Sequence, residues 1–274
     1  MHPARPQGAS AQFRTGFAFF RSGVTTVIGQ PHLWPYVFIP AMLTLTALVG
    51  AVAATWMVLD WLTASMWTAA AGASVGWTVL LWLAHWALRL LVMVVFGLAA
   101  YMVAGLIAVP FNDRLSNDIE LQVLGPEEEA FSWSVLLGDL LMSLRHTLAG
   151  LLLWATLMAL LFLLNLLPGI GSVLGTIGSV LVSCVLLSRE TMDGCMSRRR
   201  LTFMHKLRIV RANLWLCVGL GFGAWLLMWV PLMNFLVLPM AVAGGTRMFC
   251  WLELEGMVPN EAGTGPLHVN RHAG

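Results

Sequence analysis

The feature that most constrains this chain is a set of long stretches without any charged side chain. They are residues 33–59, 61–88, 90–112, 147–188 and 212–246. A helix needs about 20 apolar residues to cross a bilayer, and each stretch reaches that length. Only 10% of the residues are charged, against about 25% in soluble domains. The sequence therefore predicts an all-α integral membrane protein, and it excludes a soluble enzyme, a nucleic-acid binder and a disordered chain.

The N-terminal arm predicts an amphipathic helix in the membrane interface. In residues 13–28 apolar side chains, several of them aromatic, recur at spacings of three and four, while Arg14 and Arg21 fall on a different face. Such a helix lies among the headgroups rather than across the bilayer. The alternative is that its apolar face packs on the protein's own extramembrane part. The first twelve residues lack the apolar core of a signal peptide, so we expect the N-terminus to be retained.

Two of the uncharged stretches predict full transmembrane helices. The first helix covers 33–59. The second covers 74–112 and crosses the membrane over 90–110, because the tryptophans of 61–88 favour an interface. The N-terminal arm and the basic stretch 189–211 both belong in the cytoplasm by the positive-inside rule. An even number of crossings must separate them, and both termini of the chain are then cytoplasmic.

The two remaining stretches are interrupted by turn residues and predict helical hairpins that enter the bilayer partly or fully. One hairpin covers 130–188 with its apex near 168–171, and the other covers 212–255 with its apex near 231–234. Irregular backbone at membrane depth must be sheltered by protein or line water. The turn at 231–234 therefore predicts either an oligomer that shelters it or a wet pathway beside it. The asparagines at the apices either cap broken helices or contact a permeant ion. The apex residues are Asn165, Pro168, Gly169, Gly171, Pro231 and Asn234.

Residues 1–255 are thus expected to form one membrane domain, followed by a disordered polar tail over 256–274. The four cysteines have no C-x-x-C spacing and are interpreted as reduced structural thiols. The sequence contains no phosphate-binding loop, zinc-protease motif or nucleophile elbow. We therefore expect no enzyme activity, no metal and no cofactor. Arg89, at the edge of its apolar run, either reaches the outer headgroups or lines a pathway.

The order of several short motifs resembles the CysZ sulfate-permease family and its wider relatives, the etoposide-induced-protein-like membrane proteins. The motifs are Gln30-Pro31-His32-Leu33-Trp34-Pro35, Val109-Pro110-Phe111-Asn112-Asp113-Arg114-Leu115 with Glu120, Pro168-Gly169-Ile170-Gly171, Pro231-Leu232-Met233-Asn234, and the basic segment from Met196 to Asn213. The resemblance covers about residues 13–255. It implies two transmembrane helices plus two hairpins that enter the membrane partway, an oligomer, a bacterial inner membrane, and passage of sulfate.

The candidate anion contacts lie just before the first span. A helix N-terminus offers free N–H groups and the positive end of a dipole, so we predict an anion-binding site at Gln30, His32, Leu33 and Trp34. The alternative is that His32 and Trp34 only anchor the helix in the interface. Family members that bind sulfate resemble each other in a Gly-Leu-Arg motif here. This chain has His32-Leu33-Trp34 instead, so that arginine is absent.

At the inner mouth we expect ion pairs that either steer anions or hold the hairpins in place. They would involve Asp113, Arg114, Glu120, Arg208 and Arg211. The function predicted is a permease or channel for sulfate or a related small oxyanion, with the lipid bilayer and other copies of the chain as partners and no nucleic acid. The alternative is a non-transporting membrane scaffold or interaction protein with the same fold.

Overall fold

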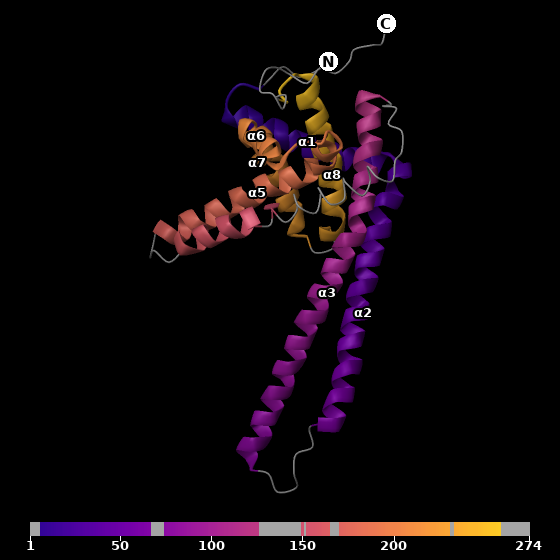
Figure 1. Cartoon of the computed structure of the whole chain (residues 1–274), viewed down its shortest axis with the longest axis vertical. Coiled ribbons are helices and arrows are strands. Elements are labelled where there is room, and N and C mark those ends of the chain that lie inside the picture. The colour runs from indigo at the N-terminus through magenta and orange to yellow at the C-terminus, as the bar shows by residue number, and fades with distance from the viewer. Residues whose placement is uncertain are drawn as a thin grey trace. The chain divides into compact units, whose positions relative to one another are not determined.

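A computed structural model describes residues 6–66, 74–125, 149–150, 152–164, 170–230 and 233–258 of the chain (Figure 1). All regular secondary structure in these ranges is helical, which confirms the all-α prediction. The chain divides into two compact units. One contains Met1–Trp34 and Asn112–Gly274, and the other contains Pro35–Phe111.

The unit Pro35–Phe111 is made of two long helices, which Figure 1 shows as rods. They are α2 (Trp34–Met66) and α3 (Val75–Leu124), and α3 continues beyond the unit. Most of their large apolar side chains are exposed, Met57 to 75%. A surface of this kind is stable in lipid and not in water, because nothing polar covers it.

Within the described residues, three helices are long and apolar enough to cross a membrane, and a bent helix pair raises the number to four if it counts as one span. The candidate spans are Pro31–Asp60, Val75–Ala100 and Gly171–Arg198. The second lies earlier than the predicted crossing over 90–110. Trp77, Trp82 and Trp86 are exposed along it, so tryptophan content alone does not separate interface from span here. Helix α3 passes through Pro110 and ends before Gly125, whose φ of 91° is a common helix stop.

Arg89 makes a polar contact between α2 and α3. Arg89 Nη2 lies 2.8 Å from Asp60 Oδ1, and the guanidinium lies 4.4 Å from the ring centroid of Trp56 and 5.5 Å from that of Trp86. A guanidinium over an indole face is attracted by the ring quadrupole, whose face carries partial negative charge. Arg89 thus links two neighbouring helices. Whether it also reaches the outer headgroups or lines a pathway stays a prediction.

The other unit packs helices against one another through glycines. Cβ atoms added at Gly16 and Gly219 would overlap the backbone of Leu216 and Phe13, and one added at Gly221 would overlap Cys184. Small residues let helix backbones approach this closely. Besides the start of the chain and the end of α3, the unit contains α1 (Ala9–Gly29), η1 (Pro31–Leu33), a helix over Leu152–Leu164, α5 (Ile170–Arg198), α6 (Phe203–Ala212), α7 (Leu214–Met228) and α8 (Asn234–Leu254).

Helix α1 packs on the protein rather than offering its whole apolar face to lipid. Gly16, Phe20 and Gly23 are buried, and the backbone of Gly23 lies against Met240 and Gly244 of α8. Its neighbours α7 and α8 form the segment predicted to enter the bilayer, so packing on an extramembrane part stays an open alternative. Arg14 and Arg21 are exposed on the other side of the helix, as the spacing predicts. Contact of that side with headgroups stays a prediction.

The helices expected on either side of both hairpin turns are present. Leu161, in the helix over Leu152–Leu164, lies against Gly178 of α5, and α7 is followed after a short connection by α8. Asn165, Pro168, Gly169, Pro231, the segment 130–148 and the tail 259–274 lie outside the described residues. Helices α6 and α7 meet at 92°, which is the geometry of a broken span or a re-entrant loop. The depth of either hairpin in lipid stays a prediction.

Candidate functional site

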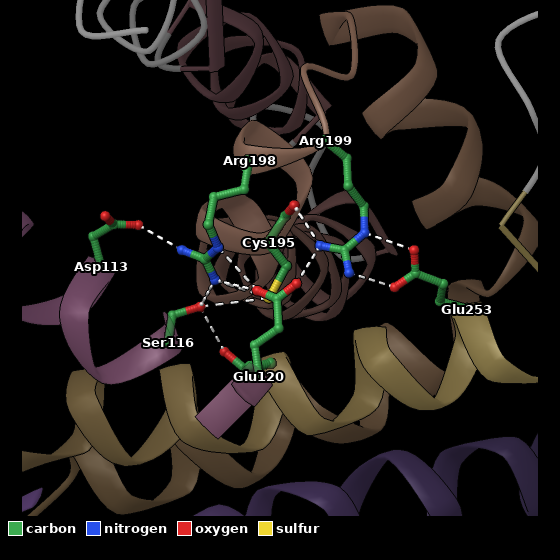
Figure 2. A network of polar contacts seen from close by, with 8 residues as sticks. Asp113, Ser116, Glu120, Cys195, Arg198, Arg199 and Glu253 are labelled. Carbon is green, nitrogen blue, oxygen red and sulfur yellow. Dashed lines mark hydrogen bonds and ion pairs between the residues drawn. The ribbon is translucent and has the colours of Figure 1, made fainter. Parts of the chain in front are cut away.

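A network of charged side chains lies within the glycine-packed unit, at the junction of three helices (Figure 2). On α3 its members recur at spacings of three and four, which places them on one face of the helix. The residues are, from α3, Asp113, Ser116 and Glu120; from α5 and the turn that follows it, Cys195, Arg198 and Arg199; and from α8, Thr246 and Glu253.

Glu120 is the centre of the network, and Figure 2 shows its carboxylate between two guanidinium groups. Its Oε2 accepts hydrogen bonds from Nε and Nη2 of Arg198 at 2.9 and 2.5 Å. Its Oε1 accepts one from Nη1 of Arg199 at 2.5 Å. One carboxylate thus binds both arginines, and only 10% of its side chain is exposed.

Each arginine also binds a second carboxylate. Arg199 donates from Nε and Nη2 to the two oxygens of Glu253 at 2.7 and 2.5 Å, a two-point contact typical of arginine with carboxylates. Arg198 Nη1 donates to Asp113 at 2.7 Å. The network therefore holds three negative and two positive charges, an excess of one negative charge.

The backbone turn after α5 directs the two neighbouring arginines to different helices. Arg200 has a φ of 53°, the left-handed conformation that ends many helices, and Leu201 N donates to Met196 O at 3.1 Å. The two arginines stand at the end of α5 and in the turn after it, where Arg198 reaches α3 and Arg199 reaches both α3 and α8.

Hydroxyl and thiol groups complete the network. Ser116 Oγ accepts from Arg198 Nη2 at 2.8 Å and from Thr246 Oγ1 at 2.9 Å. It also lies 3.4 Å from Cys195 Sγ. These contacts tie α3, α5 and α8 together at a buried point.

Electrostatics keeps Glu120 ionised despite its burial. Burial by itself would raise the pKa of Glu120, but the charges and hydrogen bonds of Arg198 and Arg199 outweigh burial and hold this pKa below its ordinary value of 4.5. Burial likewise works against the charge of Arg199, yet Glu253 and Glu120 raise the pKa of Arg199. The site is therefore ionic at neutral pH.

A cavity of about 230 Å³ opens beside the network. Both arginines and Glu120 line it, so the ion pairs are accessible from one side. The other lining residues are Asn117, Leu121, Leu124 and Gly125. An anion that enters this cavity meets guanidinium groups that already hold carboxylates.

Most of the groups predicted to bind an anion before the first span already form hydrogen bonds within the protein. Leu33 is buried, and its N–H donates to Gln30 O at 3.0 Å. The backbone N–H of Trp34 donates to Pro31 O, and its indole N–H donates to Val27 O at 3.0 Å. The amide side chains of Gln30 and Gln122 bond to each other, while His32 is exposed.

The residues predicted for the inner mouth separate into two groups. Asp113 and Glu120 lie in the network, whereas Arg114, Arg208 and Arg211 are exposed and form no ion pair within the described part of the chain. Sequence reasoning missed the partners Arg198, Arg199 and Glu253. The sequence does mark Glu253 as unusual, because this acidic residue stands among the apolar residues of Trp251-Leu252-Glu253-Leu254. The described residues contain no group of three metal-ligating side chains suited to an ion.

Comparison with known proteins gives a consistent set of relatives. The family model described as "Sulfate transporter CysZ/Etoposide-induced protein 2.4" matches residues 19–239. A sulfate transporter CysZ of Pseudomonas aeruginosa is 29% identical over 168 residues, which are 61% of this chain and 67% of that protein. A protein of the same name from Vibrio cholerae serotype O1 is 26% identical over 239 residues, or 86% of this chain and 93% of that protein. The family match includes Glu120, Arg198 and Arg199 and stops before Glu253.

Proposed function

The chain belongs to the Sulfate transporter CysZ/Etoposide-induced protein 2.4 family, and from this membership we propose that it is a multi-pass membrane permease for sulfate or a related small oxyanion. The observation that supports a role in anion passage is the pair Arg198 and Arg199 beside an open cavity. Arginine forks bind tetrahedral oxyanions as they bind carboxylates, through paired N–H donors. Glu120 occupies, between the two forks, the position that an oxyanion would take.

The carboxylates make this the closed form of the proposed passage. Three carboxylates hold two arginines, so an arriving dianion meets excess negative charge and no free fork. Passage requires at least one carboxylate to give up its arginine. Asp113 is the weakest holder, because it is the most exposed of the three and binds a single nitrogen of Arg198.

In this proposal an entering anion first contacts the exposed side chain of His32, with Gln30 beside it. The backbone N–H groups of this turn do not bind the anion. We place the chain in a bacterial inner membrane, as an oligomer with both termini cytoplasmic and both hairpins stopping short of the outer surface. Labelling of Thr176→Cys and Met233→Cys by an impermeant thiol reagent from outside should then fail. The four native cysteines are buried and give little background.

The central test is sulfate flux into proteoliposomes. Asp113→Asn should increase flux several-fold, because a neutral amide holds Arg198 less strongly than a carboxylate and the excess negative charge is removed. Arg198→Gln should lower it. Glu255→Gln, at an exposed carboxylate outside the network, is the matched control and should behave like the wild type.

A scaffold is the second candidate function, favoured by the saturation of both arginines and by Trp34 in place of an arginine. It predicts no flux above empty liposomes for the wild type or for Asp113→Asn. It also predicts no gain of flux for Trp34→Arg. That combination would replace the permease proposal.

A further inference from the structure

A second cationic cluster lies apart from the network, where α5 meets α6. It is defined by Arg189, Asp193 and Lys206. Lys206 Nζ donates to Asp193 Oδ1 and to Ser197 Oγ, both at 2.8 Å, and its side chain is fully buried. Arg189 Nη2 lies 3.9 Å from the same oxygen of Asp193, too far for a hydrogen bond. Two buried cations therefore share one carboxylate, and the lysine has the short contact.

Arg189 has an unused donor in a buried position. Its side chain is 9% exposed, and its buried Nε has no hydrogen-bond partner among the described residues. One face of the guanidinium lies 4.9 Å from the ring centroid of Phe203, and Nη1 lies against the backbone at Gly150. The adjoining Glu190 is exposed, and its charge acts on Arg189, but no ion pair within 4.0 Å joins the two side chains. Buried arginines are ordinarily hydrogen-bonded to their anion. Arg189 only shares Asp193 with Lys206 at a longer distance, which leaves it able to bind a further anion.

We propose that Arg189 binds one phosphate or sulfate group, with the buried charge of Lys206 adding attraction. The group is either a free inorganic oxyanion or the phosphate of an anionic lipid, since both offer the tetrahedral oxygens that pair with a guanidinium fork. Phe203 and Gly150 hold the fork in place, which lowers the entropy lost on binding. The site is separate from Arg198 and Arg199 and does not depend on anion passage there.

The test is binding by the full-length protein, measured without transport. In lipid-free detergent, inorganic sulfate or phosphate should raise the melting temperature if the free ion is the ligand. In nanodiscs that mix phosphatidylglycerol with phosphatidylcholine, native mass spectrometry should detect retained phosphatidylglycerol if the headgroup is the ligand. Arg189→Gln should weaken whichever binding is found by about tenfold or more, as loss of a charge-assisted contact does. Arg208→Gln, at an exposed basic position on α6, should change it less than twofold.

If Arg189→Gln does not fold, anion binding by Asp193→Asn tests the proposal independently. This substitution removes the competing carboxylate and should tighten binding several-fold. Equal binding by wild type, Arg189→Gln and Asp193→Asn, or equal losses in Arg189→Gln and Arg208→Gln, would overturn the proposal. So would the absence of binding in both the detergent and the nanodisc measurement. Flux results for Asp113 and Arg198 variants leave these outcomes unaffected, so the two proposals fail separately.

Discussion

The helices of the two units associate through different kinds of contact. In Pro35–Phe111, exposed apolar side chains cover α2 and α3, and one ion pair with two tryptophans links the helices. In the other unit, glycines bring backbones together and carboxylates and arginines are buried between helices. The first arrangement leaves lipid to fill the surface, whereas the second needs matched partners. Equivalent substitutions should therefore have very unequal effects in the two units.

The largest contrast is expected between two glycines. Gly221→Leu should abolish the folded glycine-packed unit, because even a Cβ at this position overlaps the backbone of Cys184. A destabilisation above about 4 kcal/mol is expected, in the range of the most severe substitutions. Gly97→Ala, in the other unit, meets nothing within 4 Å and should be neutral or stabilising by about 0.5–1 kcal/mol. The melting temperature of each variant is measured in detergent, and size-exclusion chromatography follows. Equal melting temperatures would remove the contrast between the units.

The next largest effect is expected at Glu120. Glu120→Gln leaves Arg198 and Arg199 with one carboxylate each, and breaking a buried ion pair typically costs about 3–5 kcal/mol. Because both arginines remain partly exposed, we expect the lower end of that range. Chemical unfolding of the purified protein is the measurement, with Glu255→Gln as the exposed control. A decrease in the free energy of unfolding below about 1 kcal/mol would show that the network stabilises the fold no more than exposed ion pairs do.

Acid should weaken the network selectively. The pKa of Glu120 is lower in the folded protein than its ordinary 4.5, so its ion pairs stabilise the fold fully above that pH. This contribution is lost as the pH falls through the folded value, where the carboxyl takes up a proton. The melting temperature of the wild type should therefore fall more steeply below about pH 4.5 than that of Glu120→Gln. Parallel curves for the two proteins would assign acid sensitivity to other groups.

The smallest effect is expected in the lipid-exposed unit. Asp60 is 67% exposed, so its pair with Arg89 resembles a surface ion pair of about 0–1 kcal/mol. A double-mutant cycle with Asp60→Asn and Arg89→Gln should give a coupling energy in that range. Trp56→Leu should show whether the indole stacking adds to it. A coupling energy above about 2 kcal/mol would mean that this contact is as strongly desolvated as the network.

Periodicity and charge patterns predicted the helices well but not their partners. Lipid-facing and protein-facing sides of a helix are both apolar, so the aromatic spacing of 13–28 did not reveal that Gly16, Phe20 and Gly23 pack on α7 and α8. In the same way, Asp113 and Glu120 stood out as charges near the membrane. Arg199, the partner of Glu120, also binds Glu253, which is 54 residues from it along the chain. Such pairs are set by tertiary packing, which local pattern does not encode.

The glycine contacts have a consequence for motion. Where two backbones touch, no side chain lies between them whose rotamer change could absorb a displacement, so α1, α5, α7 and α8 are expected to move as a single rigid body. Flexibility at this junction then belongs to long side chains such as Arg198, which can rotate while the helices stay fixed. A gate made in this way would open on the time scale of side-chain rotation and leave the helix scaffold unchanged.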